Sequence, residues 1–144
     1  MKKVTSVLFF ISLTLFSSGQ HKTNTIIVKQ ENNLNNKIFE IKLTPTSGKR
    51  DEWEWNKDEI SFNSDSLSSK IMSEKEKFNP AYCKTKTTPS SIGSTISFDA
   101  TMQNPSGSKI TWKGKATGDI ISGTVVWKYL SGTSTYSFKG TFKK

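Results

Sequence analysis

Five carboxylates lie close together between residues 51 and 59, and side chains of this type can act as acids, bases or cation ligands. They are Asp51, Glu52, Glu54, Asp58 and Glu59. Paired carboxylates catalyse glycoside hydrolysis, and clusters of carboxylates bind calcium. Their spacing matches no calcium-binding loop, and Glu52 and Glu54 would face solvent in a strand. We therefore interpret the group as a solvated charge run and predict no catalytic residue in it.

The sequence offers no base beside its single cysteine and too few ligands for a zinc site. Cys83 is the only cysteine, and His21, the only histidine, lies near the amino terminus. A thiol or hydroxyl nucleophile needs a nearby base, and zinc needs more ligands than one cysteine and one histidine. We interpret Cys83 as a partly buried thiol, with an intermolecular disulfide or a reactive thiol as the alternatives. The sequence predicts no enzyme, metal or cofactor.

Aromatic residues of the carboxy-terminal half are the candidates for ligand binding. Rings that share one interior could enclose a small apolar or amphipathic molecule, with tyrosine hydroxyls as polar contacts. The alternative is that the same rings only fill the core. The candidate ligand-binding residues are Met102, Trp112, Trp127, Tyr129, Tyr136 and Phe138.

Three turns predict how the strands that carry these rings pair. Gly118-Asp119 and Gly132-Thr133 fit two-residue hairpin loops, and a loop over 105–107 would place Gly107 in a left-handed conformation. A one-residue slip in any turn would mix the apolar and polar faces. The resulting registers pair Phe98 with Gly114, Gly114 with Gly123, Gly123 with Phe142, Trp127 with Phe138, and Tyr129 with Tyr136.

Alternation of apolar and polar residues predicts an all-β fold. The capping-box sequence from Ser73 to Glu76, followed by Pro80, predicts one short helix near residues 73–79. Consecutive hairpins predict an eight-stranded antiparallel up-and-down barrel or a strongly curled meander, with Trp53 and Trp55 near one rim. The expected strands cover residues 37–44, 57–62, 67–72, 82–88, 94–103, 108–117, 120–129 and 134–143.

The amino terminus has the pattern of a secretory signal peptide. Lys2 and Lys3 precede an apolar run from Val4 to Phe16, and small residues follow at 17–19. The run is short for a membrane-spanning helix, which is the alternative. We expect residues 1–19 to be removed, 20–36 to form a flexible arm with one short edge strand at Ile26–Val28, and 37–144 to form the barrel of an exported, periplasmic or extracellular protein.

The charge of the chain limits its partners. The formal net charge is +9, or +7 once Lys2 and Lys3 are removed, and Arg50 is the only arginine. Because bidentate recognition of phosphate favours arginine, we expect no nucleic acid partner. Attraction to an anionic glycan or lipid surface is consistent with the charge. An outer-membrane barrel with lysines in its lumen is a further alternative, but scattered glycines and charged early strands count against a membrane-spanning protein.

The sequence resembles a group of exported bacterial proteins. Trp112-Lys113-Gly114, residues 118–124, Trp127 and residues 136–141 are similar to stretches of small secreted lipocalin-like, calycin-type β-barrel proteins, which are mostly uncharacterised. The resemblance implies a calycin-type barrel with an internal apolar pocket. We therefore expect a small secreted non-enzymatic protein that binds an apolar or amphipathic ligand in its interior. The alternative is a glycan- or protein-interaction module with a filled core, acting through its lysine and threonine face or through the Trp53/Trp55 rim.

Overall fold

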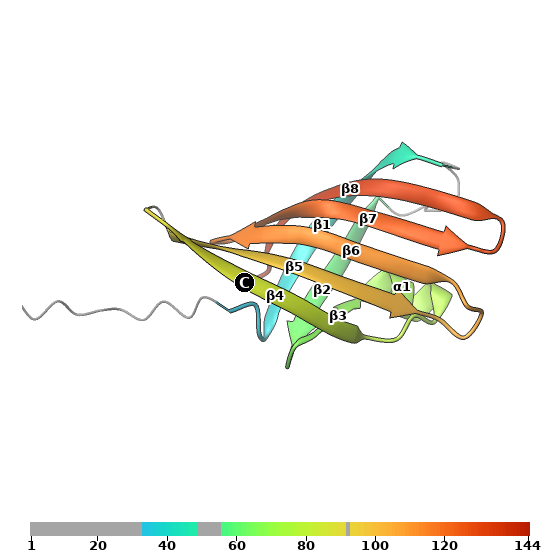
Figure 1. The fold of residues 1–144 in the computed structure, drawn as a ribbon, viewed down its shortest axis with the longest axis horizontal. Helices are drawn as coiled ribbons and strands as arrows, with labels where there is room; N and C mark the ends of the chain where they lie inside the picture. Colours follow the sequence, from blue (N-terminus) through green and yellow to red (C-terminus); the bar gives the residue numbers. More distant parts are fainter. Residues whose placement is uncertain (1–32, 49–55, 92) are drawn as a thin grey trace, which may run out of the picture. The chain divides into compact units, whose positions relative to one another are not determined.

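A computed structural model describes residues 33–48, 56–91 and 93–144 as a closed antiparallel β-barrel (Figure 1). The strands pair in chain order and the last pairs with the first. This confirms the predicted all-β barrel with a single short helix. The strands are β1 (Lys37–Ser47), β2 (Lys57–Asn63), β3 (Ser66–Ser69), β4 (Ala81–Ser90), β5 (Gly93–Gln103), β6 (Lys109–Thr117), β7 (Ile120–Tyr129) and β8 (Gly132–Phe142), and the helix α1 (Lys70–Glu76) lies between β3 and β4.

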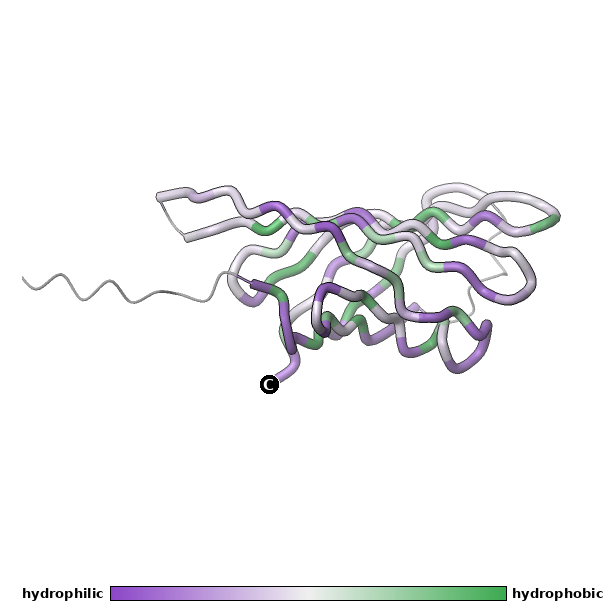
Figure 2. Tube along the Cα trace, turned by 60° about the horizontal axis from the view of Figure 1, so that its bottom comes forward, coloured by the Kyte–Doolittle hydropathy of each residue, from purple (hydrophilic) through white to green (hydrophobic). Residues whose placement is uncertain are grey.

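The barrel interior is formed by the apolar face of the strands. On β1, Phe39, Ile41 and Leu43 are buried while the residues between them are exposed. The hydropathy-coloured tube alternates in the same way along much of the sheet (Figure 2). Residues from all eight strands and from α1 contribute to one hydrophobic core. The alternation that predicted the strands therefore also identifies the side that faces the core.

The predicted register is correct for two of the three carboxy-terminal hairpins. Phe98 lies opposite Gly114, and Gly114 lies opposite Gly123. Gly107 has a φ of 86°, as the loop over 105–107 requires. The turn at Gly118-Asp119 is also confirmed, because Thr117 pairs with Ile120.

The predicted register of the β7–β8 hairpin is wrong by four residues. The turn residues are Leu130 and Ser131, so Tyr129 pairs with Gly132, Trp127 with Ser134 and Gly123 with Phe138. Because four is an even number, the slip leaves every side chain on its predicted face, and alternation could not detect it. The ring of Tyr129 covers Gly132, where an added methyl group would lie 3.2 Å from the tyrosine oxygen.

The helix begins three residues earlier than predicted. Ser69 is its N-cap and accepts a hydrogen bond from the amide of Met72, so the predicted cap at Ser73 is wrong. The third strand accordingly ends at Ser69 and does not continue to residue 72. Lys77 ends the helix in a left-handed conformation, with a φ of 59°. Met72 and Phe78 anchor this segment because both side chains are buried in the core.

The junction of β3 and β4 is the narrowest pairing in the barrel. Only two residue pairs join these strands, Ser66 with Tyr82 and Leu67 with Ala81. Beyond Cys83, β4 pairs only with β5 among the described strands. The helix α1 contacts β2 and β3 beside this junction.

Several predictions concern residues that the structure does not describe. The signal peptide at 1–19, most of the expected arm at 20–36, and the rim tryptophans Trp53 and Trp55 lie outside the described ranges. Leu34, within the last part of the expected arm, is buried at 4 % exposure. Within the described ranges, no helix has the length and apolar character needed to cross a membrane.

Candidate binding site

The six candidate ligand-binding residues come from four adjacent strands and all lie in or against the core. Met102, Trp112, Tyr136 and Phe138 are at most 2 % exposed. Trp127 is 7 % exposed, and Tyr129 is partly buried against the core. Four of the rings pack in two pairs: Trp112 lies 5.5 Å from Phe138, and Trp127 lies 5.5 Å from Tyr129, centroid to centroid. The six residues thus belong to one core, and their role in ligand binding stays a prediction.

Two aromatic rings fill the centre of the barrel beside two glycines. A methyl group added to Gly114 would lie 2.7 Å from Cζ of Phe98 and 2.9 Å from Cζ of Phe138. A methyl group added to Gly123 would lie 2.8 Å from Cε1 of Phe138. These distances are shorter than a van der Waals contact between carbons. The rings therefore rest directly on the glycine backbone, and this part of the interior holds no ligand-sized space.

One pocket is lined by inward-facing residues at the end of the barrel near Leu34. Phe62, Cys83 and Ile96 contribute core side chains to it, and Thr85 and Thr87 line its β4 side. Its volume is about 220 Å³. Sites for drug-sized ligands span roughly 300–1,000 Å³, so this pocket is small by that standard.

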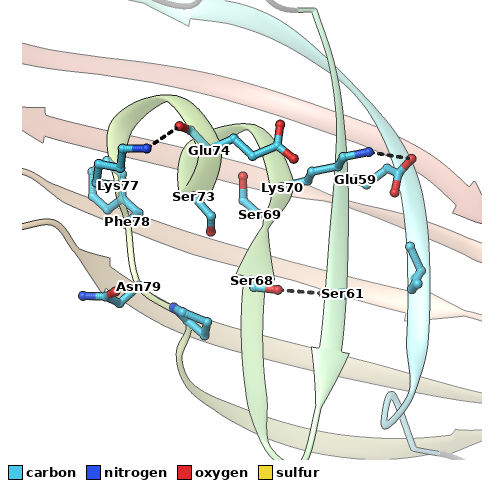
Figure 3. Close-up of a pocket in the computed structure, with 12 residues that line it drawn as sticks. Glu59, Ser61, Ser68, Ser69, Lys70, Ser73, Glu74, Lys77, Phe78 and Asn79 are labelled. Carbon is cyan, nitrogen blue, oxygen red and sulfur yellow. Dashed lines mark hydrogen bonds and ion pairs between the residues drawn. The ribbon is translucent and has the colours of Figure 1, made fainter.

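A larger groove lies on the outside of the barrel, beside α1 (Figure 3). It has a volume of about 580 Å³, and Ser61 and Ser68 form part of its wall, with their hydroxyls 2.6 Å apart. Lys77 Nζ donates to the carbonyl of Glu74, 3.1 Å away. Ser73 Oγ is buried and forms no hydrogen bond within the described part of the chain. The sequence pattern did not predict this groove, because it placed Ser73 at the helix cap, where the structure has Ser69.

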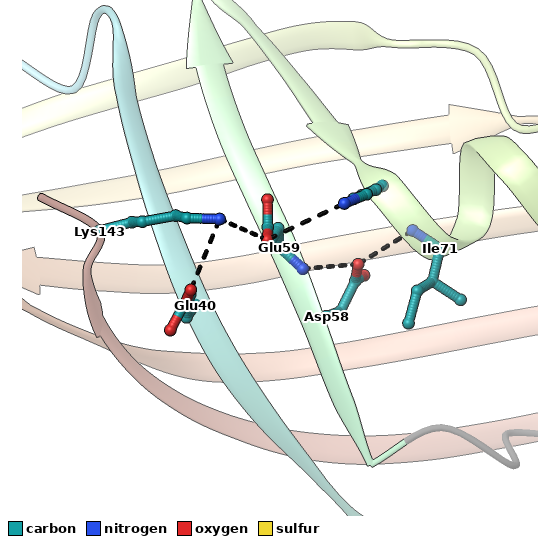
Figure 4. A network of polar contacts seen from close by, with 6 residues as sticks. Glu40, Asp58, Glu59, Ile71 and Lys143 are labelled. Carbon is teal, nitrogen blue, oxygen red and sulfur yellow. Dashed lines mark hydrogen bonds and ion pairs between the residues drawn. The ribbon is translucent and has the colours of Figure 1, made fainter.

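Asp58 is an inward-facing carboxylate that holds the start of α1 (Figure 4). Its Oδ1 accepts hydrogen bonds from the amides of Glu59 at 2.7 Å and Ile71 at 3.0 Å, and Ser69 Oγ donates to Oδ2. Burial raises the pKa of Asp58 above its usual value, and these hydrogen bonds oppose the rise. The contacts from Ser69 and Ile71 fix the start of the helix, so Asp58 has a structural role.

Glu59 faces the opposite side of β2 and belongs to a surface ion-pair network (Figure 4). Lys143 Nζ lies 2.7 Å from Glu59 Oε1 and 3.5 Å from Glu40 Oε1, and Lys70 lies 4.0 Å from Glu59. The hydrogen bond from Lys143 lowers the pKa of Glu59, and the same bond raises the pKa of Lys143. The side chains of Asp58 and Glu59 thus point to opposite faces of β2, and both residues line a depression of about 410 Å³ beside Lys70 and Ile71. Asp51, Glu52 and Glu54 lie outside the described residues.

Cys83 is a buried free thiol. Burial raises its pKa to about 11, so it is protonated at neutral pH and is a poor nucleophile. The described residues contain no group of three or more His, Cys, Asp or Glu side chains placed to hold a metal ion.

Comparison with known proteins adds no family to these observations. The chain matches no protein-family model, no curated protein and no solved structure. The closed barrel is compatible with a lipocalin-like fold, but function has to be argued from its own residues.

Proposed function

We propose that this chain is an exported, non-enzymatic binding module with a lipocalin-like, calycin-type barrel, and that it binds its partner on the outer surface while side chains fill the interior. Eight antiparallel strands paired in chain order support the calycin-type assignment. The observation that carries the surface-binding proposal is the packing of Phe98 and Phe138 against Gly114 and Gly123. This packing occupies the space that an internal ligand would need.

The relative sizes of the pockets support the same conclusion. The interior-facing pocket near Leu34 measures about 220 Å³. Grooves on the outer wall are larger, at about 580 Å³ beside α1 and about 590 Å³ over β4, β5 and β6. The outer wall therefore offers open surfaces to a partner, whereas the barrel end offers only a small pocket.

The non-enzymatic part of the proposal is supported by the state of the reactive groups. Asp58 and Glu59 point to opposite faces of β2, and each already has partners. Cys83 is buried, with a pKa raised to about 11. Acid–base catalysis needs two groups that reach one substrate, and a thiol nucleophile needs a lowered pKa.

The test compares apolar ligand uptake by the wild type with uptake by a variant that has an engineered cavity. Phe138→Ala removes a ring at the centre of the core and leaves an apolar space of the kind that binds benzene. A ligand that binds only the folded state raises the unfolding midpoint. We expect benzene and a long-chain fatty acid to leave the wild-type midpoint and tryptophan emission unchanged, and benzene to raise the midpoint of Phe138→Ala.

The alternative function, a small apolar or amphipathic ligand in the interior, predicts a different result. The wild type would then bind the fatty acid in a saturable way, with a raised midpoint and altered emission from Trp112 or Trp127. That outcome would overturn the filled-interior proposal. Should Phe138→Ala not fold, Ile110→Ala provides the same control, because Ile110 is also fully buried.

A further inference from the structure

Five lysines share a single cross-strand row on the outside of the barrel. The pairings of neighbouring strands place these residues directly opposite one another from β4 to β2. The row crosses seven of the eight strands, with lysine at five positions and serine at two. In order, it consists of Lys86, Ser97, Lys115, Ser122, Lys139, Lys42 and Lys57.

The spacing of charges along this lysine row follows from the strand separation. Neighbouring strands lie about 4.8 Å apart, so Lys86, Lys115 and Lys139 succeed one another at intervals of roughly 10 Å. A serine hydroxyl lies between each of these lysines and the next. Lys139, Lys42 and Lys57 then occupy three adjacent strands without interruption.

The acids beside the lysine row are already paired with lysines outside it. Glu40 and Glu59 bind Lys143, and Asp99 lies 3.5 Å from Lys113. Across the described ranges, the ion pairs use Lys70, Lys113 and Lys143 and none of the five row lysines. The positive charge of the row is therefore available to a partner.

Like charges placed directly opposite each other destabilise a sheet. Lys42 has Lys139 on one side and Lys57 on the other, and all three side chains are exposed. An anionic partner would remove this repulsion while gaining attraction of its own. The arrangement thus favours binding of negative charge along the row.

We propose that the lysine row is the binding site for a linear acidic polysaccharide. The carboxylates of the polysaccharide contact the lysines, and its hydroxyl groups contact Ser97 and Ser122. This inference rests on the proposed surface function and specifies its ligand class and its site. Lysine supplies the charge as a flexible point contact, and serine supplies both a donor and an acceptor for sugar hydroxyls.

The course of the lysine row favours a flexible chain over a flat anionic surface. β4 to β8 form one layer and β1 and β2 cross behind them (Figure 1). The row passes from β8 to β1 and so continues from one layer into the other. A planar lipid surface would contact only part of it, whereas a polysaccharide can follow the wall. Nucleic acid is disfavoured because the row contains no arginine to bind phosphate in a bidentate manner.

The test uses two triple variants with the same change in net charge. Lys42→Gln, Lys115→Gln and Lys139→Gln together remove the centre of the row. The control combines Lys75→Gln, Lys109→Gln and Lys128→Gln; these lysines are exposed and lie outside the row, and Lys109 and Lys128 also form a directly opposed pair. The ligand is polygalacturonate, and its fully methyl-esterified form has the same backbone without the charges.

We expect the wild type to bind polygalacturonate at roughly 50 mM salt and to lose that binding as salt screens the charges. The row variant should bind at least tenfold more weakly, the control variant less than threefold more weakly, and the methyl ester should not bind. Circular dichroism and the unfolding midpoint verify that both variants are folded.

Three results would overturn the lysine-row proposal. The first is an equal loss of affinity in the two variants, which would indicate diffuse attraction to net charge. The second is the absence of polygalacturonate binding by the wild type, and the third is tighter binding to phosphatidylglycerol–phosphatidylcholine vesicles than to the polysaccharide. Failure of the proposed surface function is seen separately, as saturable fatty-acid uptake by the wild type.

Discussion

Replacement of Gly123 by alanine should destabilise the barrel strongly, because its backbone lies against both a neighbouring strand and an aromatic ring. The added methyl group would overlap the carbonyl oxygen of Lys113 and would lie 2.6 Å from Cα of Gly114 and 2.8 Å from Cε1 of Phe138. A flexible side chain could move, but two of these three atoms belong to backbone. Overpacking of a core costs about 1–3 kcal/mol, and the overlap with backbone places Gly123→Ala at about 3 kcal/mol.

The matched control is Gly132→Ala on β8. There the nearest atom to an added methyl group is the hydroxyl oxygen of Tyr129, 3.2 Å away at the end of a side chain. Alanine also gains about 0.5–1 kcal/mol over glycine inside a strand, so this change should be close to neutral.

Urea denaturation followed by tryptophan fluorescence gives the free energy of unfolding of both glycine variants. With a slope of about 1–3 kcal/mol per molar urea, the midpoint of Gly123→Ala should fall by roughly 1–3 M. A loss below 0.5 kcal/mol for Gly123→Ala would refute the tight packing of the barrel centre. An equal loss in both variants would show that the effect does not arise from the ring and strand beside Gly123.

Three further predictions concern charge and reactivity. Lys42→Gln should raise the free energy of unfolding by a few tenths of a kcal/mol at low salt, because Lys42 lies between Lys139 and Lys57 and the change removes the repulsion. Urea denaturation measures this gain, which should vanish in roughly 0.5 M salt because salt screens the charges. A loss of stability in the variant would contradict the repulsion. The pKa of Asp58 is raised on folding, so the folded state binds its proton more tightly and stability should fall as pH rises from about 3.8 through the higher folded pKa. Asp58→Asn keeps an acceptor for the amide of Ile71 and should flatten this part of the stability–pH curve, whereas an unchanged curve would exclude Asp58 as its source. Cys83 should react with a disulfide reagent at neutral pH only after unfolding, since burial raises its pKa to about 11; rapid modification of the folded protein would show an accessible thiolate.

Strand positions and facing could be predicted because they depend on local alternation. The β1 pattern around Phe39, Ile41 and Leu43 repeats with period two, and each apolar position in it is buried. The turn residues also predicted the strand registers of two hairpins. Gly107 and Gly118 have the positive φ that these turns require. These signals lie within a few residues of the features that they determine.

The β7–β8 register could not be predicted in the same way. Gly132-Thr133 had the composition of a turn, but Gly132 is the first residue of β8 and lies opposite Tyr129, whose ring contacts it. Leu130 and Ser131 form the turn instead, and Leu130 is fully exposed. Gly132 is therefore a strand residue covered by an aromatic ring and not a loop residue, and the two uses of glycine look alike in a sequence.

The sequence contained the lysines of the proposed site but not their alignment. Lys42, Lys57 and Lys139 are distant in the chain and become neighbours only through the pairings of β1 with β2 and β8. The predicted β7–β8 register, wrong by four residues, would have placed Lys143 opposite Ser122, where Lys139 lies. A row that depends on several registers at once is lost when one of them is wrong.

The filled interior and the charged exterior are connected through the same two strands. Gly114 and Gly123 face the rings inside, and their chain neighbours Lys115 and Ser122 belong to the lysine row outside. Close packing of Phe98 and Phe138 on the glycines favours the coiling of β6 and β7, and the backbone pairing of these strands sets the spacing of the outer side chains. A rigid wall holds the backbone positions of the row lysines in place, so only the polymer and the lysine side chains have to be ordered when the polymer binds. On this reasoning, the tight packing beside Gly114 and Gly123 helps to keep the residues of the lysine row in a regular order along the outer wall.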